Sequence, residues 1–181
     1  MSDLPDASVV PDAASNPSCT RGGSSTLPGA RIDFCASRTT FSLAEAAAGI
    51  TVDYQLVADR ELTGVYTRQQ DGGGCGRPDA SGLILLAVLS GNGQRYCLCD
   101  IGLCIPPPSD VPTTVHAGTY PATFAWDGRN WTGPSDFNQP KGAPFPAGDY
   151  VLTLSSLGQV DEAGVRRDFA VTATLPIRLT P

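Results

Sequence analysis

The stretch PFPAGDYVLTL, residues 144–154, decides the fold class that the sequence predicts. Two prolines and a glycine stand directly ahead of a run in which Tyr150, Leu152 and Leu154 alternate with other residues. Turns favour Pro and Gly, and alternation with a period of two is typical of a strand with one buried face. We therefore expect a turn at the rim of a β-sandwich, followed directly by a strand.

The same period of two recurs along the chain after residue 30. In GITVDYQLVA (49–58), apolar residues stand at every second position from Ile50 to Leu56, as a half-buried strand requires. The run LILLAVL (83–89) is apolar on both faces, which predicts a central strand of a sandwich. Its short length and the glycines near both ends argue against a buried helix.

Two later segments are predicted to be strands that contain recognisable turn or edge residues, and the chain is expected to end in a strand. In YPATFAWDGRNW (120–131), alternation leads to the dipeptide Asp127-Gly128, which tolerates the positive φ of a two-residue turn and therefore predicts a hairpin. The segment VRRDFAVTATL (165–175) alternates in the same way. Pro176 follows it and, because it lacks an N–H donor, is expected to mark a sheet edge.

Composition agrees with an all-β fold. The 181 residues include 20 Gly and 16 Pro, and only 17% are charged, a balance that suits many short strands. One short helix is expected at SLAEAAAG (42–49), with Gly49 as its C-cap. We predict one antiparallel β-sandwich domain over residues 30–181, preceded by a flexible tether at residues 1–29.

Charge and hydropathy argue against a nucleic-acid partner and against a membrane-spanning helix. The net charge of −6 repels phosphate backbones, and no basic run interleaved with aromatic residues is present, so nucleic acid is not an expected partner. The longest apolar run, residues 83–89, falls well short of the ~20 residues that a membrane-spanning helix needs. No transmembrane span is expected.

The first 18 residues are rich in Asp, Ser, Ala and Pro and offer little to bury. Their composition resembles the spacer that follows the lipidated cysteine of bacterial lipoproteins, although an ordinary flexible N-terminus has the same composition. The resemblance implies a lipid anchor upstream of Met1. It also implies a periplasmic location or a place on the outer membrane or cell surface.

The cysteines support an oxidising compartment, because six thiols are unusual in reducing cytosol. Cys97, Cys99 and Cys104 stand close together in YCLCDIGLC, with Cys75 upstream and the single histidine, His116, downstream. Four of these could bind zinc, but the two C-x2-C knuckles that usually wrap one ion are missing. We favour disulfides over a metal site and expect no cofactor.

The pairing of the cysteines stays open, since six cysteines allow 15 connectivities. Our hypothesis joins Cys19 to Cys35. The remaining four, Cys75, Cys97, Cys99 and Cys104, would then form two bridges that hold residues 70–80 against residues 97–104.

No catalytic residues are predicted. Nucleophilic catalysis needs a base, and His116 lies in a loop sequence, PTTVHAGTY, without a G-x-S-x-G motif. The glycine-rich DGGGCG (71–76) lacks the Lys-Ser/Thr that completes a phosphate-binding loop. A surface histidine and a loop tethered by Cys75 are the favoured interpretations, so we do not expect an enzyme.

The span from Trp126 to Leu154 resembles the W-[DN]-G … P-x-G-x-Y signature of bacterial immunoglobulin-like domains, in particular the BsuPI-type proteinase-inhibitor domain and the Ig-like domain of flagellar hook-capping proteins. The matching residues are Trp126, Asp127, Gly128, Pro146, Gly148 and Tyr150. The resemblance implies an immunoglobulin-like antiparallel β-sandwich whose tyrosine packs on the core, and the cysteines add the expectation of disulfide-pinned loops. It implies no active site.

Two functions follow as hypotheses. The first is a non-catalytic cell-envelope module that binds an envelope or surface protein, with Trp131 and Phe137 in the aromatic loop WDGRNWTGPSDFNQP (126–140) as binding residues. Trp126 is expected to fill the core, and for Trp131 both a core role and a binding role stay open. The alternative is a BsuPI-like proteinase inhibitor that presents Arg77, directly before Pro78, on an exposed loop.

Overall fold

The chain forms two β-sheets that pack face to face, as the computed structural model shows for residues 18–68, 76–97, 111–131 and 141–181. The first sheet, sheet A, has the strand order β1-β3-β5-β11. It consists of β1 (Thr20–Arg21), β3 (Ala30–Phe34), β5 (Ile50–Ala58) and β11 (Gly118–Trp126). All neighbours in this sheet are antiparallel.

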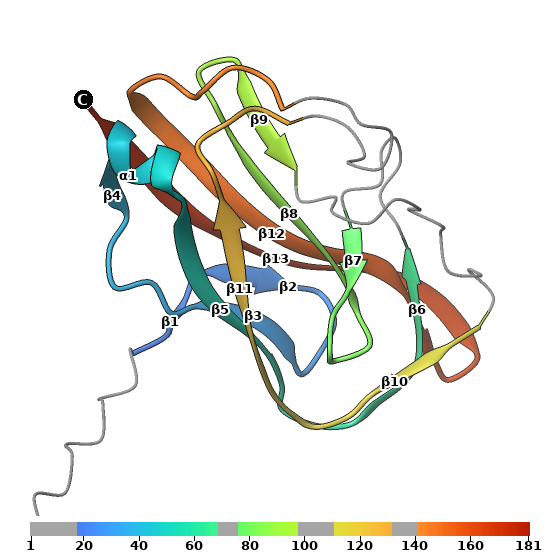
Figure 1. Cartoon of the computed structure of the whole chain (residues 1–181). Helices are drawn as coiled ribbons and strands as arrows, with labels where there is room; N and C mark the ends of the chain where they lie inside the picture. The colour runs from blue at the N-terminus through green and yellow to red at the C-terminus, as the bar shows by residue number, and fades with distance from the viewer. Residues whose placement is uncertain (1–17, 69–75, 98–110, 132–140) are drawn as a thin grey trace, which may run out of the picture.

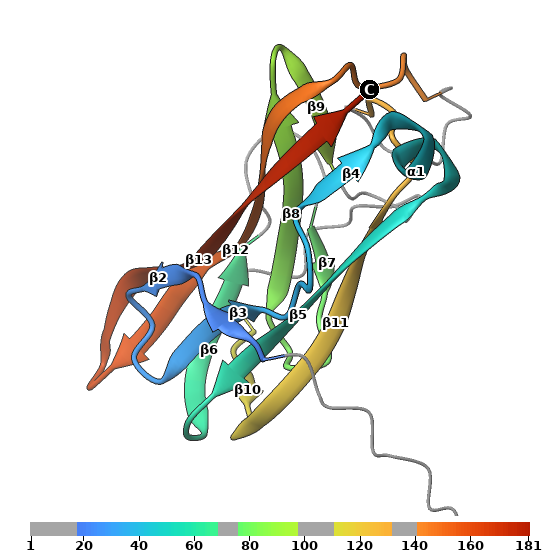
Figure 2. The same cartoon turned by 90° about the vertical axis from the view of Figure 1, so that its left-hand side faces the viewer.

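Sheet B contains the other nine strands, along a main path β10-β6-β12-β13-β2. Its strands are β2 (Gly23–Ser25), β4 (Thr40–Ser42), β6 (Leu62–Arg68), β7 (Gly76–Pro78), β8 (Ile84–Gly91), β9 (Gln94–Cys97), β10 (Thr113–Val115), β12 (Gly148–Glu162) and β13 (Val165–Thr180). The long β12–β13 hairpin is its spine, and β8 and β6 pair with successive parts of β12. One pair, β4 with β13, is parallel. Figure 2 shows the two sheets as separate layers.

The core lies between the sheets and comes from the alternating residues that the sequence indicates. In β5, the side chains from Ile50 to Leu56 are buried at every second position, whereas Thr51 and Asp53 are exposed. β8 is buried along most of its length and pairs with strands on both sides, so the prediction of a central strand is confirmed. The mainly β, two-sheet architecture follows from this pattern.

The short helix is confirmed at the predicted place. α1 spans Leu43–Ala48, with Ser42 as N-cap and Gly49 as C-cap. The Ser42 hydroxyl accepts a hydrogen bond from the Glu45 backbone N–H, and the Glu45 carboxylate accepts one from the Ser42 backbone N–H at 2.7 Å. This reciprocal capping box satisfies two donors that the first turn would otherwise leave free.

The hairpin predicted at Asp127-Gly128 is wrong. β11 pairs along its whole length with β5, and the chain beyond Trp126 does not turn back beside it. Gly128 has a positive φ of 77°, but it serves close packing: a Cβ there would lie 3.0 Å from the Ala46 carbonyl carbon of α1. A two-residue hairpin does occur at Asn92-Gly93, both with positive φ, where it joins β8 to β9.

The strand β13 does not end at Pro176 but continues to Thr180. Thr174 and Arg178 donate backbone hydrogen bonds away from β12, to the carbonyls of Gly22 and Thr39. Pro176 lies midway between them, so its nitrogen also faces away from β12. On that side of β13, β2 pairs with residues 171–173 and β4 with residues 178–180, and Pro176 falls between the two. The proline therefore occupies a local edge position inside a continuous strand, where no donor is needed.

The sheets also begin earlier than the tether boundary at residue 29 predicts. β1 pairs with β3 and β2 pairs with β13, and Leu27 is only 1% exposed. The sequence GGSST offers no apolar alternation, so the periodicity that identifies the other strands is missing here. Backbone pairing and one buried leucine hold this segment instead.

Candidate functional site

The best-defined surface feature is a pair of segments at one end of the sandwich, residues 127–131 and 141–145, which we call the loop stems. They run on either side of residues 132–140 and are hydrogen-bonded to each other. Asn130 donates from its backbone N–H to the Ala143 carbonyl at 2.9 Å and accepts from the Gly142 N–H at 2.8 Å, and Phe145 N–H donates to the Gly128 carbonyl at 2.7 Å. The two stems are thus fixed to each other on either side of residues 132–140.

Strand β9 holds the first stem from the other side. The Asn130 side-chain oxygen accepts from the Arg95 backbone N–H at 2.9 Å, and its amide group donates to Gln94. Trp131 exchanges two backbone hydrogen bonds of 3.1 Å with the strand, one to the Arg95 carbonyl and one from the Cys97 N–H. Because Asn130 bonds both β9 and the second stem, it fixes the three segments to one another.

Aromatic rings fill the space beneath the loop stems. Trp126 and Phe145 make an edge contact with ring centroids 4.7 Å apart, and Phe145 lies 4.9 Å from Tyr150. Tyr96 contacts both Trp126 and Trp131. The predicted core role of Trp126 is confirmed by its 2% exposure.

Trp131 is also buried, with 9% of its surface exposed, so of its two interpretations the structure favours the core role. Its ring packs against Tyr96 and carries the Lys141 ammonium 5.1 Å from its centroid. Its indole N–H is buried without a hydrogen-bond partner. The side chain therefore supports the stems and offers little surface to a partner. Phe137 lies outside the described residues.

Arg77 lies in strand β7, opposite Leu85 of β8, and not in a loop. The backbone at Arg77 is therefore paired in a strand, and the inhibitory role of this residue stays a prediction. Pro78 is in the same strand, opposite Ile84. A backbone paired within its own sheet is not presented to a proteinase as an isolated extended loop.

Three exposed cationic residues lie on or beside the loop stems: Arg95, Arg129 and Lys141. Lys141, the single lysine of the chain, pairs with Asp127 at 2.5 Å, and the Arg129 guanidinium lies 3.5 Å from the Gly142 carbonyl. In a chain with a net charge of −6, this end is locally basic. We did not predict it, because the three residues are far apart in sequence and only the fold brings them together.

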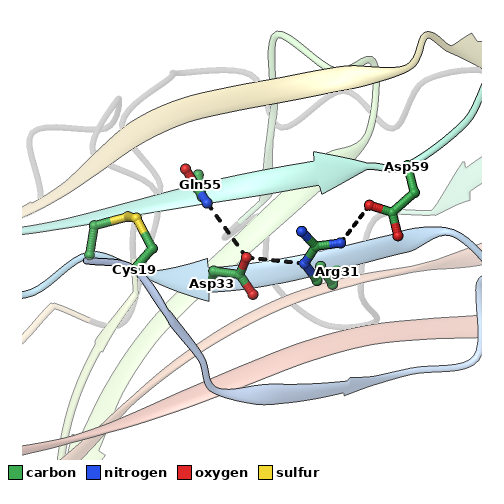
Figure 3. Close-up of polar contacts among 6 residues, drawn as sticks. Cys19, Arg31, Asp33, Gln55 and Asp59 are labelled. Atoms are coloured by element: carbon green, nitrogen blue, oxygen red, sulfur yellow. Dashed lines mark hydrogen bonds and ion pairs between the residues drawn. A yellow bond between two sulfur atoms is a disulfide. The ribbon is translucent and has the colours of Figure 1, made fainter. Parts of the chain in front are cut away.

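A second polar cluster lies on the outer face of sheet A (Figure 3). Arg31 of β3 bridges two carboxylates, with its Nε 3.1 Å from Asp33 Oδ2 and its Nη1 2.6 Å from Asp59 Oδ1. Gln55 of the neighbouring β5 donates to the same Asp33 oxygen at 3.5 Å. The hydrogen bond to Asp59, followed by the bond and charge of Asp33, raises the pKa of Arg31 above its ordinary value.

Asp33 itself is unusual for a carboxylate, because its side chain is only 8% exposed and its Oδ1 is buried without a hydrogen-bond partner. Register places it opposite Arg21 of β1 and Gln55 of β5. An unsatisfied buried carboxylate oxygen costs free energy. The cluster thus satisfies one oxygen of Asp33 and leaves the other unsatisfied.

The geometry at His116 is that of an exposed residue, as predicted. Its imidazole is 72% exposed and its Nδ1 lies 3.0 Å from Glu61 Oε2, also an exposed group. Within the described residues, no set of three His, Cys, Asp or Glu side chains gathers as metal ligands would, and no helix has the length and apolarity to cross a membrane.

The predicted Cys19–Cys35 disulfide is present. Cys97, at the end of β9, is disulfide-bonded as well, to a partner that lies outside the described residues. Cys75, Cys99 and Cys104 also lie outside them, so the hypothesis for these three stays a prediction.

No family model, curated protein or solved structure shows significant similarity to the chain. The resemblance to bacterial immunoglobulin-like domains therefore stays a prediction that depends on the six motif residues. Of these, Trp126 and Tyr150 are buried aromatic residues of the core.

Proposed function

We propose that this protein is a non-catalytic binding or assembly module of the cell envelope, an immunoglobulin-like sandwich that contacts a protein partner through the loop at its stem end. The observation that carries this proposal is that Asn130, in the first loop stem, hydrogen-bonds both the second stem and strand β9. A binding loop loses less conformational entropy on association when its ends are already fixed. The rigid aromatic layer beneath the stems serves the same purpose.

The basic surface at the stems suggests the chemistry of the partner. Arg95, Arg129 and Lys141 would favour a protein face with exposed carboxylates, and the charge would mainly raise the association rate. The rest of the molecule is acidic, so an acidic partner would be steered toward this end.

The immunoglobulin-like assignment rests on the W-[DN]-G … P-x-G-x-Y resemblance and on the hydroxyl of Tyr150, which bonds back to the Pro146 carbonyl. Tyrosines at strand starts in immunoglobulin-like sandwiches make this kind of contact. The extracytoplasmic location rests on the six cysteines and is supported by the disulfide, since reducing compartments disfavour such bridges. A lipid anchor upstream of Met1 belongs to the same proposal.

No observation among the described residues favours the inhibitor alternative, because Arg77 is paired within sheet B. The exposed ion pair of His116 likewise offers no assembled nucleophile. We therefore do not propose a reaction.

Capture of partners by the immobilised full chain from an envelope extract, quantified by mass spectrometry, tests the proposal. Arg95→Glu/Arg129→Glu reverses the charge at the stems, and Arg60→Glu/Arg167→Glu makes the same net change elsewhere. We expect the first variant to lower capture of one acidic protein at least tenfold and the second to leave it unchanged. Phe137→Ala is expected to weaken capture by about 2 kcal/mol.

Equal losses in both charge variants would show that net charge alone is responsible. Unchanged capture in all three variants would contradict a binding role for this end of the sandwich. Circular dichroism of each variant checks that the fold is intact.

A further inference from the structure

Residues 19–29 cross from the β3 edge of sheet A to the β13 edge of sheet B. We call them the N-terminal strap. Its β1 is an edge strand of sheet A, where it pairs with β3, and its β2 is an edge strand of sheet B, where it pairs with β13. Gly22 lies between them. The two short strands are the first coloured elements in Figure 1, beside β3 and β13.

Few side chains hold the strap in place. Residues 23–26 are exposed, and Leu27 is the buried side chain at its far end. Its other contacts include backbone pairing with β3 and β13, a bond from the Asp59 N–H to the Gly29 carbonyl at 2.7 Å, and a short exchange with Ala170. In this exchange Thr26 N–H donates to the Ala170 carbonyl and Ala170 N–H donates to the Thr26 hydroxyl, both at 2.8 Å. Such a segment gains little from burial relative to the conformational entropy that it loses.

The Cys19–Cys35 disulfide anchors the other end of the strap. It joins the residue before β1 to the residue after β3, across a sequence separation of 16. Closing a loop of this length lowers the entropy of the detached state. With Leu27 at one end and the disulfide at the other, the exposed middle of the strap is fixed at both ends.

The seated strap also leaves one polar atom unsatisfied. Asp33, opposite Arg21 in β1, has a buried Oδ1 with no hydrogen-bond partner. Because β1 is the strand next to Asp33, we expect its detachment to admit water to this oxygen. Solvation of a buried carboxylate oxygen favours the detached state, and the disulfide opposes it.

The disulfide is open to a small reductant. A surface pocket of about 240 Å³ is lined by Cys35 together with Ser37, Arg38 and Asp53. Cys19 is partly exposed. A soluble dithiol can therefore approach the bridge without prior unfolding of the sandwich.

We propose that the Cys19–Cys35 disulfide is a redox lock on the N-terminal strap. One thiolate of an external dithiol attacks the bridge to give a mixed disulfide, and its second thiol resolves it. The dithiol is oxidised to a cyclic disulfide, and the two electrons and two protons that it gives up reduce the Cys19–Cys35 bridge to two free thiols. The strap then detaches while the rest of the sandwich stays folded.

Release of the strap uncovers backbone edges in both sheets. β3 loses its β1 partner at Asp33 and Phe34 and becomes the edge strand of sheet A, and β13 loses its partner at residues 171–173. Such edges accept an extended segment of another chain. Gly23 packs tightly against β13, because a Cβ on it would lie 1.7 Å from the Thr172 carbonyl oxygen. A segment that replaces β2 therefore needs a glycine at the position of Gly23. This inference does not depend on the proposed function.

Limited trypsin digestion of the full chain tests the lock. Residues 1–20 contain no Lys or Arg, so cleavage after Arg21 gives a unique N-terminal peptide. Every sample is quenched and reduced before this peptide is measured, because in the oxidised protein Cys19 keeps it bonded to Cys35. Removing the bridge in Cys19→Ala/Cys35→Ala should raise this cleavage rate about 100-fold over the oxidised protein. Cleavage after Arg178, which lies in β13 between β12 and β4, is the internal control and should not change.

Treatment of the wild-type protein with dithiothreitol, which can also reduce the Cys97 disulfide, should give the same cleavage at Arg21 as the double variant. In that variant, hydrogen exchange should rise at the end of β3 that pairs with β1 but not in β12. Equal protection of Arg21 with and without the bridge would overturn the proposal, because backbone pairing alone would then hold the strap. Simultaneous cleavage at Arg21 and Arg178 would overturn it too, because the bridge would then stabilise the whole fold and not the strap.

Discussion

Tyr150 and Tyr120 make the same hydrogen bond at the starts of two strands in different sheets. The Tyr150 hydroxyl donates to the Pro146 carbonyl at 2.7 Å, and the Tyr120 hydroxyl donates to the His116 carbonyl at 2.8 Å. Each acceptor is four residues upstream, and each tyrosine follows an Ala-Gly-x tripeptide. The bond fixes the turn against the strand that it enters, which explains the placing of Pro and Gly in PFPAGDYVLTL.

The two tyrosines differ in burial, which allows a matched prediction. Tyr150 is 2% exposed, so Tyr150→Phe leaves a partly buried carbonyl without its donor and should lower the free energy of unfolding by about 1 to 1.5 kcal/mol. Tyr120→Phe removes the same bond at an exposed position and should cost less than about 0.5 kcal/mol, because water replaces the donor. Urea denaturation of both variants measures the difference. Equal losses would contradict the role of burial.

Much of the fold could be predicted because burial imposes a period of two on strands. β5, β8, β11 and β13 all lie where alternation or a continuous apolar run predicts them. The capping residues Ser42 and Gly49 likewise fix α1 through local chemistry. The alternation of the strands and the caps of α1 depend only on residues close together in the sequence, so these elements can be predicted without knowledge of distant contacts.

The rest depends on contacts between distant residues. Asp127-Gly128 and Asn92-Gly93 both tolerate positive φ, but only the second joins two strands that share a register. Trp131 is buried because its backbone bonds to Arg95 and Cys97 of β9 and its ring packs on Tyr96, which no local pattern indicates. The strap and the basic loop stems are likewise products of tertiary packing.

The turns of two hairpins provide a reciprocal test of backbone strain. Ala163 has a φ of 54° in the β12–β13 turn, and Asn92 has a φ of 47° in the β8–β9 turn. Asn tolerates this region better than Ala. Ala163→Asn should raise the free energy of unfolding by about 0.5 to 1 kcal/mol, and Asn92→Ala should lower it by about 1 kcal/mol. Thermal denaturation of both variants checks the opposite signs, and a shift in the same direction would contradict this account.

The capping box of α1 predicts a pH dependence. The backbone hydrogen bond from Ser42, together with the bond from Arg38, lowers the pKa of Glu45 below its ordinary 4.5. A lowered folded-state pKa means that the stabilisation is present above the unfolded-state value and is lost as pH falls through the folded-state value. Glu45→Gln should therefore be less stable than the wild-type protein at pH 7 and nearly equal to it at a pH below both values. Denaturant titrations at several pH values measure the gap, and a gap independent of pH would contradict the assignment.

The free edge of β11 is the last feature with a measurable consequence. β11 pairs with β5 on one side, and among the described residues no strand pairs with its other side, which lies at the outer edge of sheet A in Figure 2. Pro121 sits in the middle of this nine-residue strand, opposite Gln55, and removes one donor from the exposed edge. A missing donor disfavours edge-to-edge pairing between molecules.

Pro121→Thr restores the N–H and the β-propensity, so we expect concentration-dependent self-association in light scattering after size-exclusion chromatography. Thr123→Ala, which changes a side chain on the same strand but adds no donor, should stay as monodisperse as the wild-type protein. If Pro121→Thr were equally monodisperse, the proline would have no protective role at this edge.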